Sequence, residues 1–181
     1  MAYDQPGATY GYCLICAAPL ELRRHEDHDR PTCLNCGFIR YIDPKVAVAM
    51  VLGSEDAILL GRRNIDPARG CWSFPAGYVN RGEVLEEAVV REVAEELRIG
   101  VRVTGLVGVY SERDNPVVLV VYAGEVESGE PQADGREVSE VRYFALDELP
   151  ELAFPHDRTV LADWERLRRE GRHLDAPVHH S

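Results

Sequence analysis

The chain has 181 residues, 45% of them apolar, which is enough to bury the core of one medium-sized domain and a small appendage. Its formal net charge is −11, so its surface repels phosphate backbones and disfavours broad nucleic-acid binding. No apolar run reaches the length of a membrane span, and residues 1–12 lack the pattern of a signal peptide. We therefore expect a cytoplasmic protein with no membrane partner. A small anionic substrate would have to be bound through metal ions and a few arginines.

Four of the five cysteines have the spacing of a metal site. Cys13 and Cys16 form one Cys-x-x-Cys pair, and Cys33 and Cys36 form a second pair, with sixteen residues between the two. Four thiolates at this spacing can converge on one Zn²⁺, and a site closed by four cysteines stabilises a fold and leaves no open position for catalysis. A disulfide framework would need an oxidising compartment, of which the sequence gives no sign. Residues 1–43 resemble a zinc ribbon.

Two histidines lie in the polar stretch between the cysteine pairs. We interpret His25 and His28 as solvated loop residues rather than as metal ligands. Pro44 then interrupts regular structure and marks a junction. We expect a second domain at 44–171, followed by a tail at 172–181 to which we assign no function.

Strand-like and helix-like segments fill the second domain. Residues 46–52 form a near-continuous apolar run of strand length, and 57–60, after a glycine-containing turn, should be the hairpin partner of that strand. The other expected elements are strands at 101–110, 117–122 and 141–146, an acidic flexible loop at 128–135, and a helix at 157–169.

An acidic helix is predicted in the middle of this domain, because apolar residues recur at helical spacing from residue 84 to residue 93. Glu92 and Glu96 are four residues apart and share one helix face, and Glu95 lies beside them. Crowded carboxylates repel one another unless a cation lies between them, and oxygen ligands suit Mg²⁺ or Mn²⁺. The alternative is a solvated face held by glutamate–arginine pairs.

The segment ahead of this helix favours the metal site. Residues 71–77 read as a short apolar strand that Pro75 breaks into a tight turn, which directs backbone carbonyls toward the start of the helix. Gly77, then Glu83 after five residues, then Arg91-Glu92-Val93-Ala94-Glu95-Glu96 after seven more, resembles the Nudix box. Proteins with this signature hydrolyse nucleoside diphosphates linked to another moiety.

The resemblance runs from about residue 44 to residue 170 and implies an α/β fold, a Nudix-type α/β/α sandwich on a mixed sheet. It implies that Glu92 and Glu96 are the main Mg²⁺ ligands, and that Glu95 binds the metal directly or through water. The carbonyl of Ala76 or Gly77 would complete the ligand shell. An ion pair would join two further residues of the box, Glu83 and Arg91.

One position departs from the box. The family has a glycine two residues after the last glutamate, where this chain has Arg98, and Gly100 follows two residues later. Either Arg98 adopts the left-handed conformation that ends the helix, or the helix continues and Gly100 ends it.

The general base has two candidates. Relatives often supply a catalytic glutamate from a loop, which Glu137 matches here, and the alternative is a glutamate of the box, Glu95. Two adjacent cations, Arg62 and Arg63, are candidates for gripping a diphosphate.

Three aromatic residues are candidates for stacking on a nucleobase. These are Trp72, Phe74 and Tyr78, and the alternative for each is packing in the core or at its rim.

The substrate expectation rests on resemblance alone. The cysteine segment, the run 72–78 and the segment 143–150 are similar to FAD and ADP-ribose pyrophosphatases, which implies FAD or ADP-ribose as substrate and AMP as product. NADH pyrophosphatases share the cysteine segment but carry a Ser-Gln-Pro-Trp-Pro-Phe-Pro run where this chain has 111–116, so NADH ranks second.

A non-catalytic regulator that senses a metabolite and contacts nucleic acid through the ribbon is the alternative class. The intact box disfavours it. Relatives are often dimers, so a homodimer is left open.

Overall fold

The computed structural model describes residues 11–171, so the expectations for residues 1–10 and for the tail at 172–181 lie outside it. The chain forms two compact units, of which the first ends at Asp43 and the second begins at Pro44. Within the described range, no helix is long and apolar enough to cross a membrane.

The first unit is built on an antiparallel hairpin of β1 (Leu20–His25) and β2 (His28–Cys33). His25 and His28 form the last pair of this ladder, so the expectation that both are loop residues was wrong. Only Glu26 and Asp27 remain for the turn, and Glu26 adopts a positive φ of 51° there. The hairpin was not visible in the sequence because most of its residues are polar, so no apolar alternation marks the strands.

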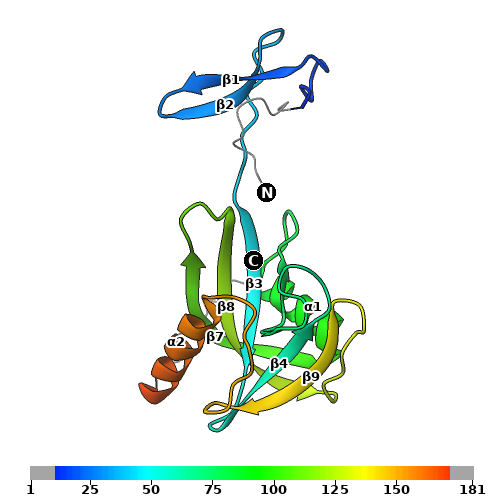
Figure 1. Cartoon of the computed structure of the whole chain (residues 1–181), viewed down its shortest axis with the longest axis vertical. Coiled ribbons are helices and arrows are strands. Elements are labelled where there is room, and N and C mark those ends of the chain that lie inside the picture. Colours follow the sequence, from blue (N-terminus) through cyan, green and yellow to red (C-terminus); the bar gives the residue numbers. More distant parts are fainter. Residues whose placement is uncertain (1–10, 172–181) are drawn as a thin grey trace. The chain divides into compact units, whose positions relative to one another are not determined.

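The second unit contains two sheets (Figure 1). The four-stranded sheet has the order β6-β3-β8-β7 and is mixed, because β3 and β8 are parallel and the other neighbours are antiparallel. The three-stranded sheet is antiparallel with the order β5-β4-β9. The strands are β3 (Lys45–Leu52), β4 (Ala57–Arg63), β5 (Trp72–Ser73), β6 (Ala76–Tyr78), β7 (Gly100–Ser111), β8 (Val117–Ser128) and β9 (Val138–Ala145).

The expected hairpin of β3 and β4 was wrong, because the chain changes sheets between them. The two strands share only an isolated bridge between Gly53 and Ile58, and β4 pairs with β5 and β9 instead. Gly53 lies directly against Trp164, since a Cβ atom on Gly53 would be 2.7 Å from the indole ring. The turn after β3 therefore packs against the helix that contains Trp164, near the other end of the chain. Local sequence does not reveal this contact.

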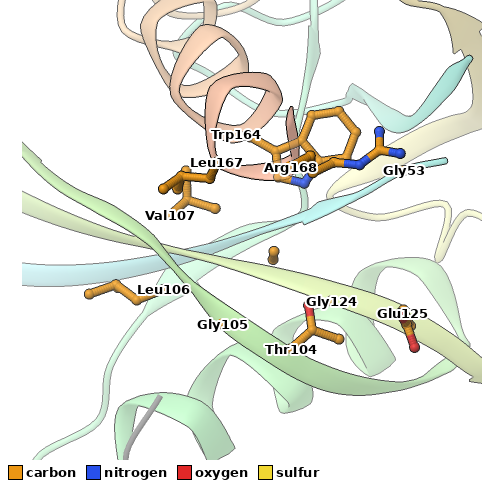
Figure 2. A pocket seen from close by; sticks show the side chains of 11 residues that line it. Gly53, Thr104, Gly105, Leu106, Val107, Gly124, Glu125, Trp164, Leu167 and Arg168 are labelled. Atoms are coloured by element: carbon orange, nitrogen blue, oxygen red, sulfur yellow. The ribbon is translucent and has the colours of Figure 1, made fainter. Parts of the chain in front are cut away.

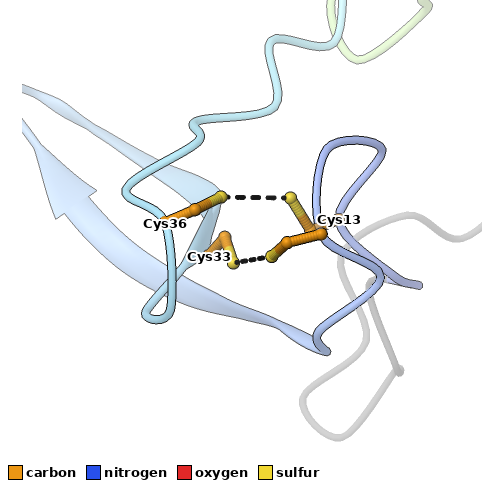
Figure 3. A group of neighbouring side chains, drawn as sticks. Cys13, Cys33 and Cys36 are labelled. Carbon is orange, nitrogen blue, oxygen red and sulfur yellow. Dashed lines mark hydrogen bonds between the residues drawn. The ribbon is translucent and has the colours of Figure 1, made fainter.

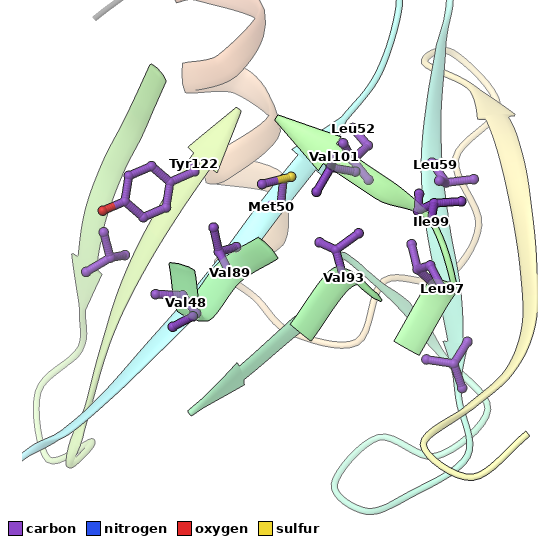
Figure 4. Packing of buried hydrophobic residues seen from close by; sticks show 13 residues of the cluster. Val48, Met50, Leu52, Leu59, Val89, Val93, Leu97, Ile99, Val101 and Tyr122 are labelled. Carbon is purple, nitrogen blue, oxygen red and sulfur yellow. The ribbon is translucent and has the colours of Figure 1, made fainter. Parts of the chain in front are cut away.

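Two helices, α1 (Leu85–Leu97) and α2 (Asp157–Arg169), cover opposite faces of β3. One face of the strand, with Met50, packs against Val89 and Val93 of α1 (Figure 4). The other face, with Val51, packs in a second cluster with Trp164 of α2. Because both faces are buried, the strand reads as a continuous apolar run. The mixed sheet between two helices confirms the predicted α/β fold of the Nudix type.

Helix α1 ends in the first of the two expected ways. Arg98 adopts the left-handed conformation, with φ 56° and ψ 32°, and its N–H lies 3.2 Å from the carbonyl oxygen of Ala94. This conformation costs a non-glycine residue roughly 1–2 kcal/mol. It turns the chain so that the next residue, Ile99, is buried at 2% exposure, and β7 then begins at Gly100.

Candidate active site

Two carboxylates of α1 are withdrawn from water. Glu96 is 9% exposed, and its Oε2 accepts a hydrogen bond of 3.2 Å from the backbone N–H of Ala76. Burial raises the pKa of Glu96 to about 8, and the negative charges of Glu92 and Glu137 add to this rise. Burial also raises the pKa of Glu92, again with a contribution from Glu137. Desolvated carboxylates that repel one another are the groups that a bound cation would stabilise most.

Gly77 is required where β6 passes the helix. A Cβ atom on Gly77 would lie 2.0 Å from Cδ of Glu92 and 2.1 and 2.2 Å from its two carboxylate oxygens. Its φ is not in the left-handed region, so close approach rather than backbone freedom explains the glycine. The first glycine of the box therefore makes room for a candidate metal ligand.

Arg91 ties the turn before α1 to the acidic face. Its Nε and Nη2 donate to the two carboxylate oxygens of Glu83 at 2.7 and 3.0 Å, and its Nη1 donates to Glu92 at 2.7 Å. It also donates to the carbonyl oxygen of Tyr78 at 3.2 Å. The hydrogen bonds from Arg91, together with one from the N–H of Asn80, lower the pKa of Glu83 to about 2. Arg91 thus fixes one oxygen of Glu92 and keeps Glu83 ionised.

The two candidate bases occupy different surroundings. The side chain of Glu95 is 62% exposed and lies 3.4 Å from Nη1 of Arg91. Glu137 is half-buried, and its charge acts on the pKa of both Glu92 and Glu96. The structure therefore brings Glu137 toward the buried carboxylates from a segment about 40 residues further along the chain.

Asp134 anchors the Glu137 loop, and sequence reasoning missed it. Its carboxylate accepts hydrogen bonds from the N–H groups of Glu137 at 3.1 Å and Val138 at 2.8 Å. Its own N–H donates to the carbonyl oxygen of Glu96 at 3.1 Å. Burial alone would raise the pKa of Asp134, but these N–H groups outweigh burial and lower it. The Asp-Gly sequence typical of such turns was the available signal.

The two arginines of β4 differ in position. Arg62 lies 3.7 Å from Glu140 and donates to the carbonyl oxygen of Gly70. Arg63 donates to the carbonyl oxygen of Pro67, and its positive charge lowers the pKa of Glu96 against the dominant effect of burial. The β4–β9 pairing register shifts between the two arginines, and Arg63 is the one whose charge acts on the pKa of Glu96.

Of the three aromatic candidates for stacking on a nucleobase, two lie in the core and one lies at the surface. Trp72 and Phe74 are 9% and 4% exposed and belong to the cluster beneath α2, so their rings have little surface to offer a nucleobase. Tyr78 is 53% exposed, and Nζ of Lys45 lies 5.0 Å from the centre of its ring.

The cysteine pairs converge in the first unit (Figure 3). The Sγ atoms of Cys13, Cys16, Cys33 and Cys36 all lie within 4.8 Å of one another, with 3.5 Å between Cys13 and Cys36 and 3.4 Å between Cys16 and Cys33. Zn–S bonds of about 2.3 Å in a tetrahedron place sulfurs about 3.8 Å apart. The cluster therefore fits Zn²⁺ with small adjustments.

A cavity of about 100 Å³ lies between the β7–β8 ladder and α2 (Figure 2). Trp164, Leu167 and Val107 line one part of it, and Thr104 and Glu125 line another. None of the candidate metal ligands lines it, so this cavity is separate from the carboxylate site.

Comparisons with known proteins identify the family of the chain. The NUDIX domain family matches residues 43–164. The chain is 39% identical over 132 residues to the ADP-ribose pyrophosphatase of Methanocaldococcus jannaschii, covering 71% of this chain and 77% of the relative. It is 30% identical over 147 residues to the NAD-capped RNA hydrolase NudC of Haemophilus influenzae, covering 80% of this chain but only 55% of that relative. The chain thus spans about half the length of NudC.

A solved structure has the same fold over nearly the whole chain. The crystal structure of a NUDIX hydrolase from Nitrosomonas europaea superposes with a TM-score of 0.82 at 30% identity, covering 91% of this chain and 95% of that one. The chain belongs to the Nudix hydrolase family, as the resemblance of residues 77–96 predicted.

Proposed function

We propose that the protein hydrolyses the diphosphate bond of a nucleotide in which ADP is linked to a second moiety, with ADP-ribose or FAD as substrate and AMP as a product. The observation that carries this proposal is the pair of carboxylates formed by the half-buried Glu92 and the buried Glu96, held beside the backbone of Ala76 and Gly77. The similarity to an ADP-ribose pyrophosphatase supports the choice of substrate.

Glu92 and Glu96 would hold Mg²⁺ or Mn²⁺, with Glu95 and the carbonyl of Ala76 as further ligands. The bound cation neutralises diphosphate oxygens and lowers the pKa of a coordinated water. Arg91 occupies one oxygen of Glu92 and leaves the other available. The raised pKa of Glu96 means that this side chain must lose a proton to bind the cation, so metal affinity should increase with pH.

Glu137 is our first candidate for the general base, and Glu95 is the alternative. The charge of Glu137 already acts on both buried carboxylates, and Asp134 holds its backbone in place. A general base must be within hydrogen-bond reach of the attacking water, which favours a positioned residue over an exposed one. Arg63 is the candidate for binding the diphosphate, because it pairs with Val138, next to Glu137, and its charge acts on the pKa of Glu96.

The structural role of the first unit is part of the same proposal. Zn²⁺ on the four cysteines would hold residues 1–43 together as a zinc ribbon, and residues 44–171 would form the hydrolase domain. We propose that the protein acts in the cytoplasm, where four reduced cysteines persist. Association of two copies would double the molecular mass measured in solution.

The test is turnover of ADP-ribose, FAD and NADH with Mg²⁺ or Mn²⁺, with products separated by chromatography. The parent should release AMP from ADP-ribose or FAD, and Glu96→Gln should lose the activity. Glu130→Gln, an exposed loop residue, serves as the matched control and should behave as the parent does. If the parent cleaves none of the three compounds with either metal, the proposal is wrong.

NADH or an NAD-capped RNA is the second candidate, and the similarity to NudC favours it. Preferred cleavage of NADH over ADP-ribose would select this candidate. A non-catalytic sensor would instead bind one of these nucleotides without cleaving it, which calorimetry with the same compounds would reveal.

A further inference from the structure

An aromatic pair lies at the start of α2, outside the residues assigned so far. The rings of Phe154 and His156 are parallel to within 4°, and their centroids are 5.4 Å apart. This spacing is typical of offset stacking, in which part of each ring face stays uncovered. Both residues are partly exposed, unlike Trp72 and Phe74. We call Phe154 and His156 the aromatic shelf.

The aromatic shelf is held in place by Asp157. This residue is 2% exposed, and its Oδ2 accepts a hydrogen bond of 3.0 Å from the N–H of Phe154, while its own N–H lies 3.1 Å from the carbonyl oxygen of Phe154. Nε2 of His156 lies 3.6 Å from Oδ1 of Asp157, and Nδ1 lies 3.9 Å from Glu112 of the β7–β8 loop. The shelf is therefore preorganised, which lowers the entropic cost of binding a ring to it.

Arg63 connects the aromatic shelf to the carboxylates. Its guanidinium carbon lies 5.1 Å from the centre of the Phe154 ring. Its charge lowers the pKa of Glu96 and that of Asp157, although burial dominates both and raises the pKa of Asp157 to about 6. Arg63 also pairs with Val138 in the β4–β9 ladder, and the N–H of the next residue, Asn64, donates to the carbonyl oxygen of Glu137 at 2.8 Å. Arg63 thus lies beside the loop of Glu137 at the candidate metal site as well as beside the shelf.

This order matches the chemistry of a nucleotide. A nucleotide carries a flat aromatic base at one end and phosphates at the other, with ribose between them. The structure offers an aromatic surface, then a guanidinium suited to phosphate, then carboxylates suited to a divalent cation. The buried rings of Trp72 and Phe74 do not offer such a surface.

We propose that the aromatic shelf of Phe154 and His156 stacks on the nucleobase of the substrate while Arg63 contacts its phosphates. The inference rests on the proposed function, because it assigns the base-binding part of the same site. It makes the shelf a determinant of specificity for nucleotides over sugar phosphates that lack a base.

The test compares binding of AMP with binding of ribose 5-phosphate by calorimetry on the full chain with Mg²⁺. For Phe154→Leu, the Kd of AMP should rise about tenfold and that of ribose 5-phosphate should not change, since stacking on an aromatic ring contributes to base binding only. Phe154→Trp should restore the affinity for AMP. Tyr143→Leu, an aromatic residue at 53% exposure on β9, is the matched control and should leave both affinities unchanged.

Three results would overturn the inference. The first is a parent that binds AMP no more tightly than ribose 5-phosphate. The second is an equal loss for both ligands in a folded Phe154→Leu variant, as judged by thermal unfolding. The third is a loss of AMP affinity in Tyr78→Leu but not in Phe154→Leu, which would place the base on β6. Because binding is measured without turnover, these results are independent of whether the proposed hydrolysis occurs.

Discussion

Replacing Gly77 by alanine tests the site most sharply, because it should remove activity while leaving the protein folded. The added Cβ would lie 2.0 Å from Cδ of Glu92, whereas real Cβ contacts are essentially never under 3.0 Å. The carboxylate of Glu92 must therefore move by about 1 Å or more. Its side chain is 14% exposed and bound to Arg91, so the movement strains or breaks that hydrogen bond.

The expected magnitudes for folding and catalysis differ. Loss of one hydrogen bond to a charged group costs about 1.5–3 kcal/mol of unfolding free energy, which most folded domains tolerate. A displacement of about 1 Å in a catalytic constellation costs about 100-fold in rate. We expect Gly77→Ala to unfold cooperatively at a modestly lower temperature and to lose about 100-fold in kcat/KM for the substrate that the parent cleaves.

A double-mutant cycle provides the control. Glu92→Asp shortens the side chain and withdraws it from the added Cβ, so Gly77→Ala should cost much less in the Glu92→Asp background than in the parent. The reasoning would be refuted if Gly77→Ala kept its activity within about twofold of the parent. It would also be refuted if the two substitutions acted additively.

Three further predictions concern charge and metal. Burial raises the pKa of Glu96 from 4.5 to about 8, so without added Mg²⁺ its contribution to stability is present below about pH 4.5 and is lost as the pH rises toward 8. Urea unfolding at several pH values should show this decline in the parent and not in Glu96→Gln. A lysine in Arg91→Lys cannot reproduce the bidentate hydrogen bond with Glu83. This variant should lower kcat/KM about tenfold and raise the Mg²⁺ concentration needed for half-maximal activity. An unchanged Mg²⁺ dependence would contradict the positioning role of Arg91. Cys33→Ser should release zinc, which elemental analysis of the purified protein measures as a loss from about one Zn²⁺ per chain.

Periodicity and spacing were enough to predict the elements that position the carboxylates. The apolar residues from 85 to 93 gave the correct helix because they pack on one face toward β3, and the helix at 157–169 was predicted for the same reason. Such one-sided patterns are local, so a single sequence displays them.

Features that depend on distant contacts were not predictable. The turn after β3 leads into a different sheet because Gly53 lies against Trp164, more than 100 residues away in the chain. Strand pairing of this kind depends on tertiary packing rather than on local preference. In the same way, nothing in the run 72–78 distinguished Phe74, which is buried, from the exposed Tyr78.

The role of Asp134 shows a third kind of limit. An aspartate before a glycine predicts a turn. The hydrogen bond from the N–H of Asp134 to the carbonyl oxygen of Glu96 exists only because the loop passes close to the end of α1. The sequence predicted Glu137 as a candidate base by resemblance, and the structure adds the contacts that hold this residue near the buried carboxylates.

The central claim is that Glu92 and Glu96 of α1 form the metal site on which hydrolysis depends. Electron paramagnetic resonance of Mn²⁺ titrated into the protein tests it most directly, with the turnover of each sample measured in parallel. We expect the parent to remove the signal of unbound Mn²⁺ as activity appears, and the variant with Glu92→Gln and Glu96→Gln to do neither. Equal binding of Mn²⁺ by that variant, or release of AMP by the parent without a divalent cation, would contradict the claim.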